Sequence, residues 1–179
     1  MTNHQNAWST LDSTVDHEGF LYSAGHDRVR RPDGETQSYD WISVPDIVVI
    51  VARTADEIIL VEQYRPPAND QVLECPAGIV EPDESPVEAA IRELREETGY
   101  RADTGTHLYT HNPLPGLLRH QLHVVWLSEL TPGESAMDDG EFIELRTVPI
   151  EDAIDVARTP PANGMTLMTL LIAQEDGLL

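Results

Sequence analysis

The hydrophobic and polar positions along the chain predict strands that alternate with helices. The run at 46–52 is β-branched and apolar after its first position, which is typical of a buried central strand. Shorter runs of similar character predict further strands, at 58–63, 72–75, 122–127 and 142–148. Helical periodicity predicts helices, at 85–98, 150–157 and 163–174. This mixed order indicates an α/β domain in which layers of helix, sheet and helix bury the core.

The N-terminal part of the chain has a different pattern. Its first sixteen residues are polar, and we expect them to be loosely held. Residues 19–41 show short apolar–polar alternations that are interrupted by Pro32-Asp33-Gly34, a strong turn signal. These features predict a hairpin or a small group of strands. We therefore expect a strand segment at 1–41 and a main domain at 42–179.

The clearest helix signals surround residues 85–98. Ser85 and Glu88 form the Ser-x-x-Glu pattern of a capping box. Pro86 suits the first helical position, and Gly99 is the expected C-terminal stop. Apolar or small residues at helical spacing define the stripe that we expect to be buried: Val87, Ala90, Ile91, Leu94 and Thr98.

The charge balance limits the possible partners. Eleven basic residues, all of them Arg, face 32 acidic residues, and the formal net charge is −21. Such a surface repels nucleic-acid phosphates and anionic lipids, so it disfavours nucleic-acid or membrane-surface binding as a main role. Self-repulsion destabilises the compact state at low salt, and counterions relieve it. The composition therefore suggests adaptation to a saline interior, and the alternative is an acidic protein without that adaptation.

Nothing in the sequence predicts secretion or a membrane span. Cys75 is the single cysteine, so an intrachain disulfide is excluded. Residues 1–10 show neither the basic nor the apolar region of a signal peptide. The apolar run at 47–52 is far too short to cross a bilayer. We therefore expect a cytoplasmic protein.

Three carboxylates share one face of the 85–98 helix. At 100° per residue, Glu93, Glu96 and Glu97 lie roughly 120° around the helix axis from the apolar stripe. Glu93 and Glu97 form a like-charge i, i+4 pair, which costs a helix about 0.2–0.5 kcal/mol. Arg92 and Arg95 offset part of that cost. From this spacing alone, a solvated acidic face is the simpler interpretation.

The residues before the helix favour a metal site instead. Gly78 lies between a predicted strand and the helix, where a glycine lets the backbone approach a ligand closely. Three carboxylates and a free loop carbonyl form an all-oxygen set suited to a hard divalent cation such as Mg²⁺. Because Mg²⁺ bridges substrate phosphates, the implied partner is a phosphate ester or a diphosphate. The seven histidines show no paired metal spacing, so a zinc site is not preferred.

These residues match a known motif. Gly78, then Glu84 after five residues, then the run 92–100 after seven more resemble the Nudix box. Only Tyr100, which stands where an aliphatic residue is usual, departs from it. The resemblance implies a Nudix-type α/β/α sandwich with a mixed sheet, and hydrolysis of a nucleoside diphosphate linked to another group. It also implies Mg²⁺ as the cofactor, with Mn²⁺ as the alternative.

The resemblance assigns roles to the positions of the motif. Glu93, Glu96 and Glu97 are implied to be metal ligands, with the carbonyl of Ala77 as a fourth, and the first and last of these acids are also catalytic candidates. The remaining motif residues are implied to brace the loop and the helix: Gly78, Glu84, Arg92 and Gly99. Glu84 is also implied to reach the metal through water.

Residues outside the box resemble the ADP-ribose pyrophosphatase branch of this family. The runs 61–67 and 73–78 carry this resemblance, together with Pro115. It implies that Arg65 and Glu74 bind substrate. A planar guanidinium can engage two phosphate oxygens, so Arg65 is expected to face the diphosphate. The alternative for Arg65 is a surface ion pair.

Two positions depart from the pattern of the branch. Cys75 replaces a usual Leu, and we expect a small core residue rather than a nucleophile. His120 stands where the branch often carries an acid, which weakens the case for ADP-ribose in particular.

The general base lies outside the box. In this branch an acid on a mobile loop orients the attacking water. The acidic stretch 137–141 precedes a predicted strand and contains Gly140 as a hinge. Glu141 is the first candidate, followed by Asp139 and Glu144. The alternative is a solvated acidic loop.

The expected activity is Mg²⁺-dependent hydrolysis of ADP-ribose, or a similar nucleoside diphosphate sugar, to a nucleoside monophosphate and a sugar phosphate. One alternative is a Nudix hydrolase for another nucleotide. Another is a sensing module that binds ADP-ribose, although such modules generally lose box acids and this box has lost none. The branch also implies a homodimer with the segment 1–41 at its interface; the alternative is that this segment packs on its own subunit.

Overall fold

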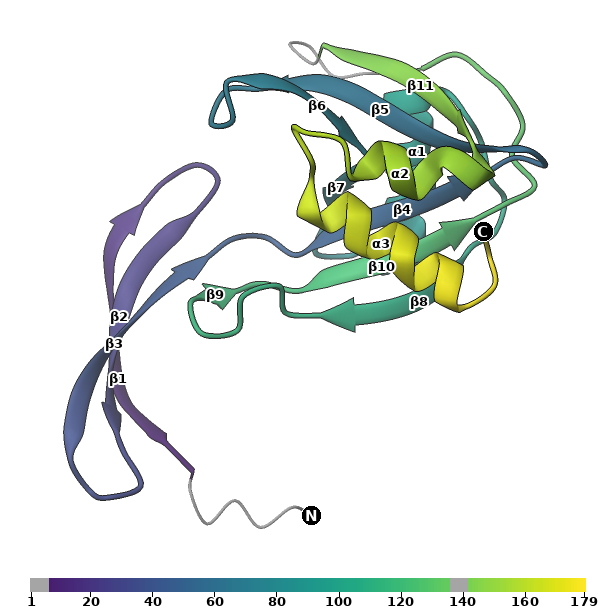
Figure 1. The fold of residues 1–179 in the computed structure, drawn as a ribbon. Coiled ribbons are helices and arrows are strands. Elements are labelled where there is room, and N and C mark those ends of the chain that lie inside the picture. Colours follow the sequence, from purple (N-terminus) through teal and green to yellow (C-terminus); the bar gives the residue numbers. More distant parts are fainter. Residues whose placement is uncertain (1–6, 136–141) are drawn as a thin grey trace. The chain divides into compact units, whose positions relative to one another are not determined.

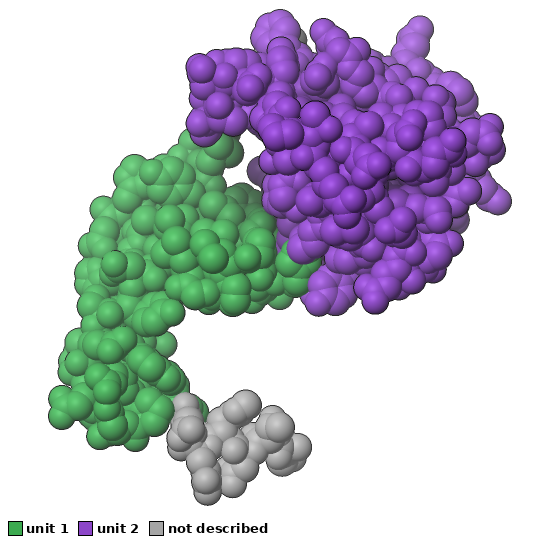
Figure 2. Space-filling model, in the orientation of Figure 1, with its two compact units in different colours: residues 1–46, 111–121 green, residues 47–110, 122–179 purple. Residues whose placement is uncertain are grey.

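The computed structural model describes residues 7–135 and 142–179 (Figure 1). The chain divides into two compact units, which Figure 2 shows in different colours. The first unit comprises residues 1–46 and 111–121, and the second comprises residues 47–110 and 122–179. The first unit therefore includes a segment from the middle of the chain. No helix among the described residues is long and apolar enough to cross a membrane.

A mixed sheet forms the centre of the second unit. Its neighbouring strands, in order, are β11 (Ile143–Pro149), β5 (Glu57–Arg65), β4 (Ile47–Arg53), β10 (Leu122–Leu127) and β8 (Thr106–His111). Two short strands extend it, namely β6 (Asp70–Glu74) beside β5 and β7 (Ala77–Ile79) beside β4. β4 pairs parallel with β10 and antiparallel with β5. The apolar run at 46–52 therefore forms a central strand, as predicted.

Helices cover both faces of this sheet. They are α1 (Pro86–Thr98) on one face, and α2 (Ala153–Ala157) and α3 (Gly164–Glu175) on the other (Figure 1). The 3₁₀ turn η1 (Ile150–Asp152) leads into α2. Val49 and Val51 of β4 pack with α2 and α3, whereas the alternate residues of the strand pack with α1. A strand buried on both faces needs apolar side chains at every position. The expected α/β/α sandwich is confirmed.

α1 begins and ends where its sequence signals lie. The Ser85 hydroxyl accepts a hydrogen bond from the Glu88 N–H, and the Glu88 carboxylate accepts one from the Ser85 N–H, at 3.3 and 2.8 Å. The predicted capping box is therefore confirmed. Gly99 adopts φ 77°, a left-handed conformation that favours glycine, and its N–H donates to the Arg95 carbonyl.

The first unit is a small sheet of antiparallel strands with one short parallel addition. Its strands, in order, are β1 (Ser9–Glu18), β2 (Ser23–Arg30), β3 (Thr36–Ser43) and β9 (Leu118–Arg119). The turn between β2 and β3 contains Pro32-Asp33-Gly34, with Gly34 at φ 90°. The hairpin predicted from that turn is confirmed.

The expectation that the first sixteen residues are loosely held is wrong from Ser9 onward. β1 pairs antiparallel with β2 along its length. Nearly all of its side chains are exposed, so β1 has no apolar alternation that a sequence pattern could reveal. Backbone pairing with the edge of β2 defines this strand, and that pairing is a property of the folded sheet.

Two strands of the second unit were also missed. Residues 77–79, expected as a loop with a free carbonyl, instead form β7 and pair antiparallel with Ile47, Val48 and Val49 of β4. Three residues are too few to show an alternating pattern. β8 is partly exposed and polar, and it joins the sheet as an edge strand beside β10. Both strands depend on a neighbouring strand rather than on their own hydrophobicity.

Candidate active site

The backbone of β7 lies close against one face of α1. A Cβ atom placed on Gly78 would lie 1.9 Å from the carboxyl carbon of Glu93. Any side chain at this position would therefore displace that carboxylate. The sequence motif needs a glycine here because the Glu93 carboxylate fills the space next to the strand.

Glu97 follows Glu93 by one helical turn and faces the same strand. Its Oε2 accepts a hydrogen bond from the Ala77 N–H at 3.1 Å, and only 8% of the residue is exposed. A carboxylate that is this buried needs such a partner to offset its lost hydration. The structure thus brings together three of the predicted ligand positions, Ala77, Glu93 and Glu97.

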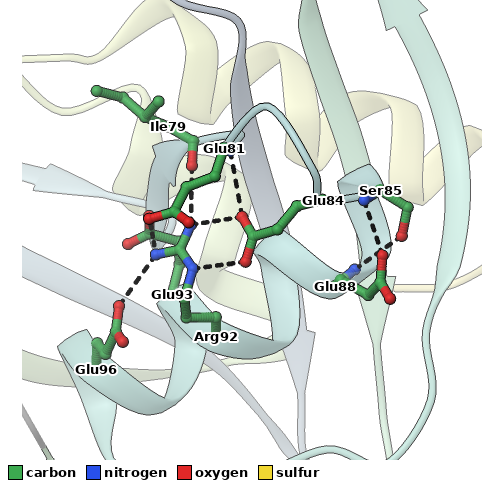
Figure 3. A network of polar contacts seen from close by, with 8 residues as sticks. All are labelled: Ile79, Glu81, Glu84, Ser85, Glu88, Arg92, Glu93 and Glu96. Atoms are coloured by element: carbon green, nitrogen blue, oxygen red, sulfur yellow. Dashed lines mark hydrogen bonds and ion pairs between the residues drawn. The ribbon is translucent and has the colours of Figure 1, made fainter.

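Arg92 joins the remaining acids of the motif (Figure 3). Its Nε and Nη2 donate to the two oxygens of Glu84 at 2.8 and 2.9 Å. Its Nη1 donates to Glu93 at 2.7 Å and to Glu96 at 3.1 Å, and Nη2 also donates to the Ile79 carbonyl at 2.9 Å. We call this set of Ile79, Glu84, Arg92, Glu93 and Glu96 the Arg92 cluster.

The charges of the Arg92 cluster shift the pKa values of its members. The hydrogen bonds from Arg92 lower the pKa of the Glu84 carboxyl. The carboxylates of Glu84, Glu93 and Glu96 in turn raise the pKa of the Arg92 guanidinium above its ordinary value, and Glu84 has the largest effect. Three carboxylates share one guanidinium, so the cluster keeps a negative charge. The predicted bracing roles of Glu84 and Arg92 agree with these contacts.

The oxygen donors of Glu93, Glu96 and Glu97 are of the type that suits a hard divalent cation, whereas their arrangement in this structure does not gather them around one. Among the described residues, no three Asp, Glu, His or Cys side chains are gathered in a way that could hold a metal ion. Glu93 and Glu96 are instead turned onto Arg92. Carboxylate oxygens are nevertheless the ligands that Mg²⁺ prefers, and the cradle at Gly78 holds one of them beside the backbone. Metal binding here would replace contacts of Arg92 with contacts to the cation.

A second polar group surrounds the buried carboxylate of Glu74. Its Oε2 accepts hydrogen bonds from Gln63 Nε2 at 3.1 Å and from Arg65 Nε at 2.8 Å, and Arg65 Nη2 lies 2.6 Å from the same oxygen. Its Oε1 accepts a hydrogen bond from Asn163 Nδ2 at 2.5 Å. We call Gln63, Arg65, Glu74 and Asn163 the Glu74 cluster. Arg65 therefore forms an ion pair, but with a buried carboxylate rather than the surface partner that the alternative supposed.

A small pocket brings the two regions together within the second unit. Its lining includes Arg65, Glu74 and Asn163 from the Glu74 cluster. It also includes Ala77 and Glu97, which lie beside the predicted metal ligands. The pocket is therefore lined by the carboxylates of Glu74 and Glu97 and by the guanidinium of Arg65.

The general base has three candidates, of which Glu141 and Asp139 fall outside the described residues. Glu144 lies in β11 with 70% of its side chain exposed, and its carboxylate is 2.8 Å from Arg146. In the first unit, Nδ1 of His120 is hydrogen-bonded to the Pro45 carbonyl at 2.7 Å.

Cys75 is a core residue, as predicted. It is buried, and burial raises the pKa of its thiol to about 12. A thiol with so high a pKa is a poor nucleophile at neutral pH. Its backbone N–H donates to the Thr166 hydroxyl of α3 at 2.9 Å.

Sequence reasoning missed two members of the Glu74 cluster, Gln63 and Asn163. Gln63 could have been predicted, because it lies two residues before Arg65 in β5 and therefore on the same face of the strand. Asn163 is the first residue of the helix predicted at 163–174 and was a recognisable N-cap. Its contact with Glu74 joins residues 89 positions apart, and no local pattern indicates that contact.

The chain is similar to several known proteins. The model of the NUDIX domain matches residues 42–167. The ADP-ribose pyrophosphatase of Bacillus subtilis (strain 168) is 34% identical over 134 residues, which cover 73% of this chain and 72% of that protein. The methanol dehydrogenase activator of Bacillus methanolicus is 34% identical over 131 residues, covering 72% and 71%. A solved structure titled as an ADP compounds hydrolase has a TM-score of 0.85 and 22% identity, covering 96% of this chain and 97% of the other.

Proposed function

The chain belongs to the NUDIX domain family, and we propose that it hydrolyses the diphosphate bond of ADP-ribose or a related nucleoside diphosphate sugar. The products are a nucleoside monophosphate and a sugar phosphate. The placement of Arg65 in the lining of one small pocket with Ala77 and Glu97 carries this proposal, since a diphosphate needs a guanidinium and a cation to neutralise its charge. The ADP-ribose pyrophosphatase that is 34% identical supports the choice of substrate.

The acids of α1 are proposed to hold the divalent cation, which is Mg²⁺ or, as the alternative, Mn²⁺. Glu93, Glu96 and Glu97 and the Ala77 carbonyl would be its ligands. Bound there, the cation supplies neutralisation of the diphosphate and a lowered pKa for a coordinated water. Arg92 and Glu84 keep the acids in place through the contacts of the Arg92 cluster.

The guanidinium of Arg65 is proposed to hold the diphosphate. Arg65 contacts Glu74 through Nε and Nη2. With respect to the described residues, Nη1 stays available to a ligand, and 47% of the Arg65 side chain is exposed. Glu141 remains the proposed general base that orients water toward phosphorus, with Asp139 and Glu144 as alternatives.

Product analysis on a panel of nucleotide sugars with Mg²⁺ tests this function. We expect ADP-ribose or a close analogue to give the nucleoside monophosphate and the sugar phosphate in equal amounts. Cleavage of an oxidised nucleotide alone would redirect the assignment to another substrate. Tight binding of ADP-ribose without turnover would overturn hydrolysis in favour of sensing.

The protein is further proposed to form a homodimer through the N-terminal strands. Large apolar side chains of the first unit are exposed, which is unusual for a surface without a partner: Trp8, Val15, Phe20, Leu21, Tyr22, Tyr39, Leu114 and Leu117. β1 is exposed along nearly its whole length, so it buries little apolar surface within its own sheet and leaves an edge open to a partner.

Light scattering in molar salt tests the dimer. Removing residues 1–41 is expected to give a monomer and to weaken substrate binding more than it slows chemistry. Phe20→Ser combined with Leu21→Ser is the milder form of the experiment, and Phe142→Ser, an exposed apolar residue of the second unit, is its control. A full-length protein with the mass of one chain would refute the dimer.

A further inference from the structure

The Glu74 cluster contains a residue with two separate tasks. Asn163 is the N-cap of α3, and its Oδ1 accepts hydrogen bonds from the N–H groups of Met165 and Thr166 at 2.8 and 3.1 Å. Its Nδ2 is a donor, and it forms a hydrogen bond to Oε1 of Glu74 at 2.5 Å. One amide side chain therefore begins the helix and holds a carboxylate of the pocket. An ordinary cap needs only the first of these contacts.

The ion pair of Arg65 shows that the Glu74 carboxylate positions its guanidinium. Asp70 is paired directly opposite Arg65 in the β5–β6 ladder, and its carboxylate accepts from the Gln71 N–H instead. Arg65 reaches back along the strand to Glu74, which is paired opposite Val61. The guanidinium is thus held over the pocket by a buried acid rather than by the exposed one beside it.

Each oxygen of Glu74 has its own donors. Oε2 holds Gln63 and Arg65, and Oε1 holds Asn163. The orientation of the carboxylate plane is therefore fixed from both ends. Without the Asn163 donor, the carboxylate would gain freedom to rotate, and the long side chain of Arg65 would follow it.

We propose that Asn163 is a positioning residue that sets the orientation of Arg65 toward the substrate, acting through Glu74. The identity of the substrate rests on the proposed function, whereas the coupling of these side chains does not. Glu74 then serves as the connecting carboxylate, and its acceptor positions are used within the protein. This role differs from the direct substrate contact that the family resemblance implied for Glu74.

Asn163→Ser separates the two tasks of the residue. Serine is as good an N-cap as asparagine, so α3 keeps its cap, but the donor to Glu74 is lost. We expect KM for ADP-ribose to rise about three- to tenfold, the loss typical of one net intramolecular hydrogen bond, with kcat within about twofold. Asn163→Asp keeps the cap and places a carboxylate against Glu74, so its KM should rise further.

Asn163→Ser in an Arg65→Ala background tests whether Asn163 acts through Arg65. If Asn163 acts through Arg65, Asn163→Ser leaves KM of the Arg65→Ala protein unchanged. If it raises KM by the same factor in both backgrounds, the proposal is wrong, because Asn163 would then act on the substrate or on the fold by another path. An equal loss of kcat with no change of KM would also overturn it. Asp70→Asn is the matched control, with KM expected to stay at the wild-type value.

A stability measurement keeps this test independent of the substrate. Melting temperatures are compared for Asn163→Ser, Glu74→Gln and the double variant, all as full-length chains. Coupled side chains give a double variant that is less destabilised than the sum of the single ones, and additive effects would refute the coupling. If the wild type cleaves no nucleotide sugar, the proposed function fails, and this cycle still decides whether Asn163 and Glu74 act as a pair.

Discussion

The Arg92 cluster and the Glu74 cluster are built from the same chemistry with the charges exchanged. In the first, a guanidinium is the centre and carboxylates surround it. In the second, a carboxylate is the centre and donors surround it, including the guanidinium of Arg65. Both lie in the second unit, and the pocket is lined by the Glu74 cluster and by neighbours of the Arg92 cluster.

The opposite charge arrangement of the two clusters predicts which kind of ligand each cluster accepts. An excess of carboxylates over guanidinium leaves the Arg92 cluster able to take a cation. An excess of donors over carboxylate leaves the Glu74 cluster able to offer hydrogen bonds to an anion. A metal-bound diphosphate presents both kinds of charge. The two clusters together therefore suit that class of ligand better than either would alone.

Glu97→Gln is expected to have the largest effect, because it removes a charge from the cation side without changing the shape of the side chain. The loss of a key charge-stabilising group lowers the rate by about 10²–10³-fold. Turnover of ADP-ribose at saturating Mg²⁺ measures it. Glu88→Gln is the matched control, since Glu88 lies on the same helix and serves the capping box. An unchanged rate for Glu97→Gln would remove Glu97 from the metal site.

Arg92→Met tests whether the Arg92 guanidinium and a bound cation share the same carboxylates. Without Mg²⁺ the substitution should lower the free energy of unfolding by about 1.5–3 kcal/mol, because the surrounding carboxylates lose a charged donor. Mg²⁺ should then stabilise the variant more than the wild type, since a bound cation replaces the lost charge. Thermal melts with and without Mg²⁺ measure both effects.

Arg146→Met is the control for that experiment. Arg146 forms an ion pair with Glu62 that is largely exposed, and such pairs contribute about 0–1 kcal/mol. Its Mg²⁺-dependent shift in melting temperature should equal that of the wild type. An equal shift for Arg92→Met as well would mean that Arg92 and the cation do not share ligands.

Glu84→Gln tests the electrostatic part of the Arg92 cluster through pH. Arg92 lowers the pKa of Glu84 below the ordinary value of 4.5 in the folded state. This pair therefore stabilises the fold above that value, and the contribution is lost as the pH falls through the lowered pKa. The difference in unfolding free energy between wild type and Glu84→Gln should be largest at neutral pH and should shrink in acid. Denaturant titrations at a series of pH values measure it, and a constant difference would contradict it.

The smallest effect per side chain is expected from the exposed acids outside both clusters. With a net charge of −21, the melting temperature should rise from low to molar KCl as surface repulsion is screened. The destabilisation by Arg92→Met should largely persist in molar KCl, because partly buried pairs are screened less. A flat melting temperature across that range would mean that the acidity is not an adaptation to salt.

The two clusters also differ in how far the sequence predicts them. Glu84 and Arg92 are eight positions apart, and a capped helix fixes the relative positions of Arg92, Glu93 and Glu96. Spacing along one helix therefore predicted that its acids share a face, and the resemblance to the Nudix box implied that Glu84 and Arg92 brace them. Glu74 and Asn163 are 89 positions apart, and their contact depends on α3 packing beside the end of β6. The spacing of these two residues along the sequence does not predict that contact.

The sequence by itself determined the elements whose signals are local. The apolar run of β4, the capping box of α1 and the Gly78–Glu93 spacing each follow from residues that are close along the chain. Only the tertiary structure decided β1, β7 and the Glu74 cluster. The reason is that each of these requires a partner from a distant part of the chain: an edge for a strand that buries little, or a donor for a carboxylate that is buried.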